Sequence, residues 1–278
     1  MARPIYGATL GTNPFSVTPV FISACNQGST TTLVNDVNGG ANWSIANATW
    51  DSTNGLQCNG DGKRVDAPWS EFSSDHTLIA LYKQIATDPT DATWLVGHTS
   101  GSAHWGDYEI RRQTDIYGRY GEAWDSVSHA AFSADEEYEV VYWSDTTNTN
   151  FRFQIDGQDS GWNIQGGAWG NQTTAGIGGA TGAAGYHSNA LLYFVALYDG
   201  VMSDADLATL LADPYALWTS ALYTGTIDQS PTGIAKNTYV KIATVAPTDD
   251  TLTVTISAAG SVGSDVVVAD NVGITLVE

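Results

Sequence analysis

Six aromatic residues lie in or beside segments rich in Gly, Ser and Asn, where a side chain could reach a ligand. They are Trp105, Tyr117, Tyr120, Trp124, Trp162 and Trp169. Sugar recognition without chemistry needs aromatic platforms together with a few polar groups. Each of these side chains could equally fill the core, because a large β sandwich needs bulky residues in its interior. The pattern therefore predicts glycan-binding candidates and leaves a core role open for each.

Charged residues alternate with apolar ones along two predicted strands. In residues 107–113 the period of two places Glu109 and Arg111 on one face, and in 150–155 it places Arg152 opposite an apolar face. These three side chains could share one polar sheet face that holds a ligand. The alternative is a solvent-facing sheet whose arginines pair with nearby glutamates.

Catalytic patterns are not recognisable in the sequence. Glycoside hydrolysis commonly needs two carboxylates, and on one strand they would recur with the period of two that puts them on one face. The nearest acidic run, 135–139, is interpreted as a turn that leads into a strand. Lyase chemistry would need a cationic group and a proton-moving Tyr or His, and no lyase motif is found. We therefore expect no catalytic residues and no enzyme activity.

Metal ligands and thiols give weak signals. Calcium prefers hard oxygen ligands from loops, and Asp61, Asp156 and Asp159 are the candidates, although aspartate is common in turns. Calcium is thus a possible cofactor, and no other is expected. The two cysteines, Cys25 and Cys58, are too few for a disulfide framework. Two alternatives stay open: one disulfide bridge between them, or two buried thiols.

The chain is strongly acidic, with 30 Asp and Glu against 10 Lys and Arg and a net charge of −20. Such a surface repels nucleic-acid backbones and anionic membranes, so neither is an expected partner. The most apolar run, 190–198, is far too short to cross a bilayer. The start of the chain has no signal peptide, so we expect synthesis in a cytoplasm unless a signal was removed.

Short apolar runs separated by Gly- and Asp-containing turns predict an all-β chain. One helix is expected after Ser203, where Ser203 and Asp206 resemble a capping box and Pro214 ends the element. After residue 222 the aromatic residues almost vanish. The predicted organisation is an N-terminal arm at 1–27, a β sandwich at 28–222 and a small C-terminal β module at 223–278.

Several segments in this order resemble the laminin-G-like branch of the concanavalin A-like lectin/glucanase superfamily. They are residues 33–36 with 55–62, 138–143, 151–157, and 191–207 with the following Asp213, Pro214 and Tyr215. The resemblance covers about 190 residues and implies an antiparallel jelly-roll sandwich with one short helix. It says little about function, because one fold carries many activities. Such domains occur in adhesion proteins, in polysaccharide-active enzymes and on bacteriophage particles.

The missing signal and the acidic surface favour the bacteriophage setting. We therefore expect a non-catalytic surface protein of a virion, of capsid-decoration or fibre type, whose lectin-like domain can bind surface glycans. Its other partners would be virion proteins or further copies of itself in a homo-oligomer. Two alternatives stay open: a secreted or cell-surface carbohydrate-binding module, and a polysaccharide hydrolase or lyase.

Overall fold

The chain forms two compact units, Met1–Thr219 and Ser220–Glu278. Our computed structural model describes the following residues of the first unit: 9–28, 30–51, 55–60, 62–85, 93–98, 108–112, 115–120, 123–130, 132–166, 174–179 and 188–219. In the second unit it describes two short antiparallel pairs, β20 (Val240–Ile242) with β23 (Ile256–Ala258) and β21 (Pro247–Thr248) with β22 (Thr251–Leu252).

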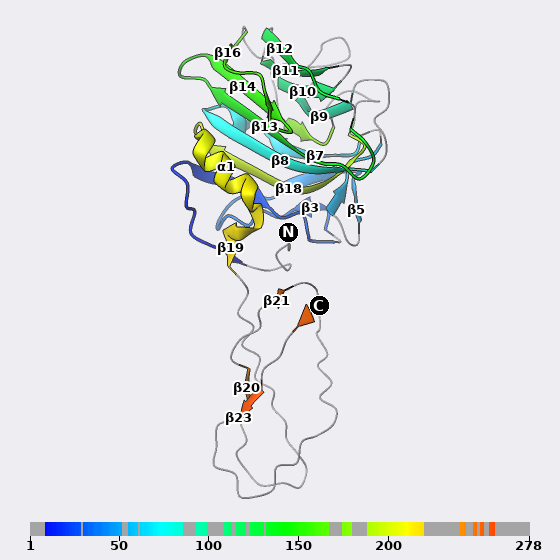
Figure 1. Cartoon of the computed structure of the whole chain (residues 1–278), viewed down its shortest axis with the longest axis vertical. Coiled ribbons are helices and arrows are strands. Elements are labelled where there is room, and N and C mark those ends of the chain that lie inside the picture. Colours follow the sequence, from blue (N-terminus) through cyan, green and yellow to red (C-terminus); the bar gives the residue numbers. More distant parts are fainter. Residues whose placement is uncertain are drawn as a thin grey trace, which may run out of the picture. The chain divides into compact units, whose positions relative to one another are not determined.

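The first unit is built from two large antiparallel sheets (Figure 1). In spatial order the eight-stranded sheet holds β12 (Ala123–Val127), β11 (Ile116–Tyr120), β10 (Tyr108–Arg112), β9 (Thr93–His98), β17 (Thr174–Ile177), β7 (Arg64–Pro68), β4 (Trp43–Ala46) and β3 (Thr32–Leu33). Strands β11 and β12 pair antiparallel, and residues 121–122 between them are not described.

The second sheet has nine strands. Its main path runs through β15 (Gln158–Asp159), β14 (Asn150–Ile155), β13 (Glu137–Asp145), β8 (His76–Gln84), β18 (Ala190–Asp199), β6 (Gly55–Gln57) and β5 (Thr49–Asp51). Off this path, β16 (Asn163–Ile164) pairs with β14, and β2 (Thr18–Ser23) pairs with β18. The segment expected to be an N-terminal arm therefore supplies a strand to this sheet.

Four smaller elements complete the first unit. They are η1 (Trp69–Phe72), α1 (Asp204–Ala212), η2 (Pro214–Leu217) and the pair of β1 (Thr9–Leu10) with β19 (Trp218–Thr219). The helix begins as predicted, because the Ser203 hydroxyl accepts a hydrogen bond from the Asp206 backbone N–H at 3.1 Å. The all-β sandwich with one α-helix is thus confirmed.

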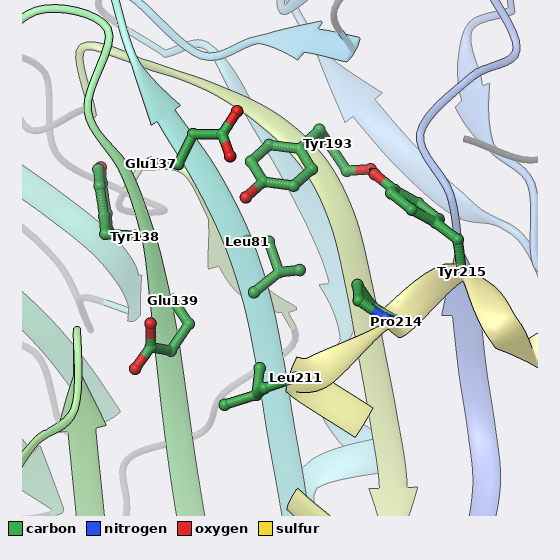
Figure 2. Close-up of a pocket in the computed structure, with 8 residues that line it drawn as sticks. All are labelled: Leu81, Glu137, Tyr138, Glu139, Tyr193, Leu211, Pro214 and Tyr215. Carbon is green, nitrogen blue, oxygen red and sulfur yellow. The ribbon is translucent and has the colours of Figure 1, made fainter. Parts of the chain in front are cut away.

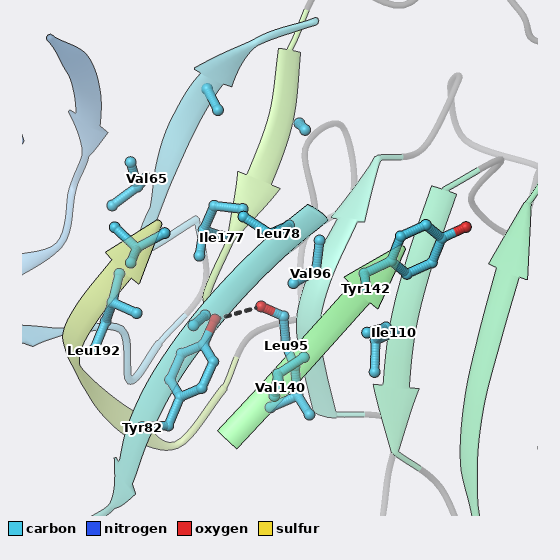
Figure 3. Packing of buried hydrophobic residues seen from close by; sticks show 14 of the residues in the cluster. Val65, Leu78, Tyr82, Leu95, Val96, Ile110, Val140, Tyr142, Ile177 and Leu192 are labelled. Carbon is cyan, nitrogen blue, oxygen red and sulfur yellow. Dashed lines mark hydrogen bonds between the residues drawn. The ribbon is translucent and has the colours of Figure 1, made fainter. Parts of the chain in front are cut away.

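An aromatic and aliphatic core fills the space between the two sheets (Figure 3). On β14 the alternation works as predicted, because Phe151, Phe153 and Ile155 are all buried. The Tyr82 hydroxyl of the nine-stranded sheet donates to the Leu95 carbonyl of the other sheet at 2.6 Å. This buried hydrogen bond fixes the relative position of the two layers while satisfying a polar group in the core.

A second core covers the opposite face of the nine-stranded sheet. Outward-facing side chains of that sheet, including Ile79 and Val141, pack against Leu207 and Leu210 of α1 and against the N-terminal segment. In Figure 1 the yellow helix lies across this sheet. The central strands β8 and β18 are consequently buried on both faces, which explains their nearly continuous apolar sequences.

The outer face of the eight-stranded sheet is open by comparison. Its described outward side chains are half-buried or exposed, and they include Ser44, Arg64, Asp66 and Trp124.

Among the residues that the structure describes, no helix is long and apolar enough to cross a membrane. Both cysteines lie buried in the core between the sheets, and no disulfide joins them.

One buried carboxylate ties the end of the first unit to its N-terminal part. The Trp218 indole N–H donates to Asp36 at 3.1 Å. Burial raises the pKa of Asp36 to about 6, and this hydrogen bond only partly opposes the effect. The folded state therefore binds the Asp36 proton more tightly than the unfolded state, and the resulting stability is lost as the pH rises from about 4 to about 6.

We predict that Asp36→Asn raises the free energy of unfolding at pH 7 by about 1 kcal/mol, because the amide keeps an acceptor for Trp218 without a buried charge. Near pH 4 the gain should vanish. Urea unfolding at both pH values measures it, with Asp115→Asn, at the half-buried bend before β11, as control. Because His76 is buried with a pKa lowered to about 4, both proteins lose stability below pH 6.5, so the difference between them is the quantity to compare. An equal gain at both pH values would contradict the prediction.

Candidate functional site

The hairpin of β11 and β12 presents polar and aromatic side chains on the open face of the eight-stranded sheet. Ile116 and Tyr120 of β11 are buried, whereas Tyr117 and Arg119 alternate with them and point outward. On β12 the outward position opposite Arg119 is Trp124. Arg119 and Trp124 are thus direct cross-strand neighbours.

The Trp124 indole is the prominent feature of this face. Its side chain is 64% exposed, and its ring centroid lies 5.8 Å from that of Tyr117 with the ring planes tilted by 50°. Exposing so large an apolar surface to water is unfavourable, so an exposed indole beside a second ring is a feature typical of binding surfaces. We define Tyr117, Arg119 and Trp124 as the aromatic face.

The neighbouring strand β10 pairs with β11 along its whole length. Its backbone register places Glu109 opposite Arg119 and Arg111 opposite Tyr117. That Glu109 and Arg111 share one face of the sheet stays a prediction from the alternation. With Arg112, these two strands carry three of the ten Lys and Arg residues of the chain. Over 108–125 the charges nearly cancel, with three Arg against four Asp and Glu, whereas the whole chain carries a net charge of −20.

Close packing between the sheets holds β11 in place. A Cβ added at Gly118 would lie 2.1 Å from a ring carbon of Phe153, so only glycine allows this approach. The Tyr142 hydroxyl also donates across the core to the Arg119 carbonyl at 2.9 Å. Tyr117 and Arg119 flank Gly118 in the chain. The core contacts at Gly118 and at the Arg119 carbonyl therefore fix the backbone from which both side chains project.

A second candidate site is a pocket of about 360 Å³ on the other sheet (Figure 2). It lies beside the end of α1 and η2, where the helical cover stops. Aromatic and aliphatic side chains line it together with two carboxylates: Leu81, Glu137, Tyr138, Glu139, Tyr193, Leu211, Pro214 and Tyr215. A pocket with apolar walls and a few polar groups is the common form of a small-molecule site.

A β-bulge aims Tyr193 into this pocket. Leu192 pairs with Tyr82 and Phe194 with Leu81, so Tyr193 is an extra residue in β18. Figure 2 shows its ring extending toward β13, where Glu137 and Glu139 project from the same face. Glu139 accepts hydrogen bonds from the Gly157 N–H at 2.6 Å and the Gln154 amide at 3.3 Å. The acidic run was interpreted as a turn that leads into a strand, and the structure bears this out, because a turn at 134–135 precedes β13.

Two of the predicted site residues, Tyr120 and Arg152, do not lie on the aromatic face. Tyr120 is buried and packs against Phe151 with ring centroids 6.3 Å apart, so its side chain belongs to the core. Arg152 lies on β14 of the nine-stranded sheet, so it cannot share a face with Glu109 and Arg111, and this prediction was wrong.

Arg152 has a structural environment of its own. It pairs with Asp159 at 2.5 Å and with Asp204 of α1 at 2.6 Å, and its guanidinium lies 4.5 Å from the Trp143 ring centroid. Hydrogen bonds and charge from both aspartates raise its pKa. These contacts link the helix to the hairpin after β14.

The remaining candidates are placed as follows. Trp162 is 46% exposed beside β16, and Trp105, Trp169 and Asp61 lie outside the described residues. Asp156 lies 3.5 Å from His129, and Asp159 is paired with Arg152. Within the described part of the chain, no three His, Cys, Asp or Glu side chains gather into a metal-binding group. Calcium at Asp61, Asp156 or Asp159 stays an untested prediction.

Comparison with known proteins identifies the fold through solved structures. No family model matches the chain, and no curated protein matches it. A Trypanosoma rangeli sialidase bound to sialic acid has a TM-score of 0.59 and 18% identity, over 78% of this chain and 37% of that chain. The same enzyme bound to 2,3-difluoro-KDN also gives a TM-score of 0.59 and 18% identity, over 79% and 37%. The chain spans little more than a third of these sialidases, and the likeness shows the fold alone.

This likeness contradicts our expectation of a non-catalytic phage surface protein. The structures named above are of a sialidase and not of a virion protein. An acidic surface and a missing signal are compatible with many roles, so they did not justify that choice. Our exclusion of enzyme activity is also overturned. It required a carboxylate pair, and sialidases depart from that rule by using a tyrosine nucleophile.

We predict that Gly118→Ala destabilises the sandwich by roughly 2 kcal/mol, because the new methyl group collides with Phe153. The thermal midpoint should fall accordingly. A second change, Phe153→Leu, should recover part of the loss when added to Gly118→Ala, since it removes ring atoms at the collision. Gly157→Ala is the control, because its open turn position has a φ of +71° and its loss comes from backbone strain alone, which Phe153→Leu should not relieve. Failure of Phe153→Leu to recover any of the Gly118→Ala loss would contradict the proposed contact.

Proposed function

We propose that the chain binds glycans through a concanavalin A-like jelly-roll sandwich, as the sugar-holding part of a glycoside hydrolase of sialidase type. The likeness to sialidases supports the glycan class, and the aromatic face supplies the chemistry that binding would need. The observation that carries the proposal is Trp124, which is exposed beside Tyr117 and directly opposite Arg119 on the open sheet.

Each part of the aromatic face matches one property of an acidic sugar. The C–H face of a sugar ring can pack on the Trp124 or Tyr117 ring, as apolar ligand surfaces do on aromatic side chains. The guanidinium of Arg119 can form two parallel hydrogen bonds to a carboxylate. The nearly balanced charge of residues 108–125 would weaken the repulsion between an anionic glycan and a protein of net charge −20.

We predict that Trp124→Ala weakens binding to sialyllactose by at least tenfold, because it removes the stacking surface. Arg119→Gln should weaken sialyllactose binding more than lactose binding, since only the former carries a carboxylate. Isothermal titration measures both. The mostly exposed Trp124 should be removable without a large change in thermal midpoint.

Trp69→Ala is the matched tryptophan control, since Trp69 lies on η1 and stacks on Phe72, away from the aromatic face. Unchanged sialyllactose affinity in Trp124→Ala and Arg119→Gln, with the fold intact, would refute the assignment of this face.

A second candidate function is hydrolysis of a glycosidic bond in the pocket of Figure 2. The specific observation behind it is the position of Glu137 and Glu139 two residues apart on one strand face, with Tyr193 brought in by the bulge. Residues two apart on a strand leave the same face, which is the arrangement that can bring two carboxylates to one sugar.

If this pocket is catalytic, Glu137→Gln and Glu139→Gln should each reduce release of 4-methylumbelliferone from aryl glycosides by about a hundredfold. Glu136→Gln provides the control, because Glu136 sits in the preceding turn and accepts from the Ser133 N–H. Absence of any hydrolysis by the wild-type chain, across sialosides and neutral glycosides, would exclude this second candidate while leaving sugar binding to be judged separately.

A further inference from the structure

We propose that the glycan site continues past Trp124 onto Trp162, so that the preferred ligand is an extended oligosaccharide rather than a single terminal sugar. This inference rests on the proposed function. It assigns a second sugar-binding position to the segment that carries β16.

Exposed apolar side chains gather at one edge of the sandwich. Among the described residues, the large apolar side chains that are exposed are Trp124, Trp162 and Ile164. Trp124 belongs to β12, the last strand of the eight-stranded sheet, whereas Ile164 belongs to β16 of the other sheet. Trp162 and Ile164 are two residues apart and are both exposed, while Asn163 between them is half-buried. The two therefore face the same way.

The two sheets meet at this edge. Strand β12 lies against β16, and the Gly166 N–H donates to the Tyr120 carbonyl at 3.0 Å, which joins the end of the β16 segment to β11 (Figure 1). The surface that carries Trp124 therefore continues around the edge to Trp162. A ligand chain lying on Trp124 would meet the second indole there.

The segment around Trp162 is rigidly held although its indole is exposed. Asp159 accepts hydrogen bonds from the Arg152 guanidinium and from the Gly161 N–H, the latter at 2.8 Å. The Asn163 amide donates to the Gly161 carbonyl at 3.1 Å, and the Gln165 amide donates to the Asn150 carbonyl at 2.7 Å. These contacts fix the backbone on both sides of Trp162, so little conformational entropy is lost when a ligand binds. A preorganised exposed ring with nearby amides has the composition of a sugar platform.

The test compares affinity against ligand length. Oligosialic acids of two to six sugars are titrated into the full chain, into Trp162→Ala and into Trp124→Ala. For the wild-type chain, affinity should rise about tenfold from the dimer to the pentamer. Trp162→Ala should bind the dimer within twofold of wild type and lose most of that rise. Trp162→Phe keeps a ring and should keep the rise, which separates stacking from any loss of fold.

Two results would overturn the inference while leaving the proposed function in place. One is a Trp162→Ala profile equal to that of wild type at every length, with Trp124→Ala impaired throughout. The other is a change in sedimentation of the unliganded Trp162→Ala chain with unchanged glycan affinities, which would make the edge a protein contact. Failure of the wild-type chain to bind any of the oligomers would instead reject both proposals.

Discussion

The nine-stranded sheet is covered on both faces, and this constraint decides where the chain can present a binding site. One face packs on the other sheet, and the other lies under α1, η2 and the N-terminal segment. Burial of β8 and β18 on both sides removes a large apolar area from water and supplies much of the driving force for folding. The eight-stranded sheet has an open outer face, so a ligand platform on a sheet face belongs there. The pocket at Glu137 and Glu139 exists only because the helical cover stops short of it.

The same core that stabilises the sandwich also shapes the aromatic face. Gly118 permits Phe153 to approach β11, and the Tyr142 hydroxyl holds the Arg119 carbonyl from across the core. Because these contacts act on the backbone of β11, Tyr117 and Arg119 project from a strand whose position is fixed from beneath. A site on strands held in this way is preorganised, and preorganisation lowers the entropy that binding must offset.

Alternation in the sequence predicted individual strands well but not the sheet to which each strand belongs. Period two correctly placed Phe151, Phe153 and Ile155 in the core. It also placed Arg152 on the face of β14 opposite the core. Arg152 and Arg111 nevertheless lie on different sheets, because a local sequence pattern does not say which strands pair with one another. Tyr120 was ambiguous because Gly118 interrupts the apolar face of β11. That glycine is explained only by a long-range contact with Phe153.

The pocket illustrates a different limit of sequence analysis. The acidic run at 135–139 was correctly interpreted as a turn that leads into a strand, but only the fold shows that Glu137 and Glu139 line a pocket. Tyr193 lies in an uninterrupted apolar strand, where a bulge has no recognisable sequence signal. The capping box at Ser203, by contrast, was found directly, because its chemistry is contained within four consecutive residues.

Mapping of indole and backbone amide NMR shifts during titration with sialyllactose tests the central claim most directly. If sugar binds on the open face of the eight-stranded sheet, the Trp124 indole and the amides of β11 and β12 should move together along one saturable curve, while resonances near Glu137 and Tyr193 stay in place. Saturable shifts confined to the pocket beside η2, or no shifts at millimolar sugar, would contradict the account.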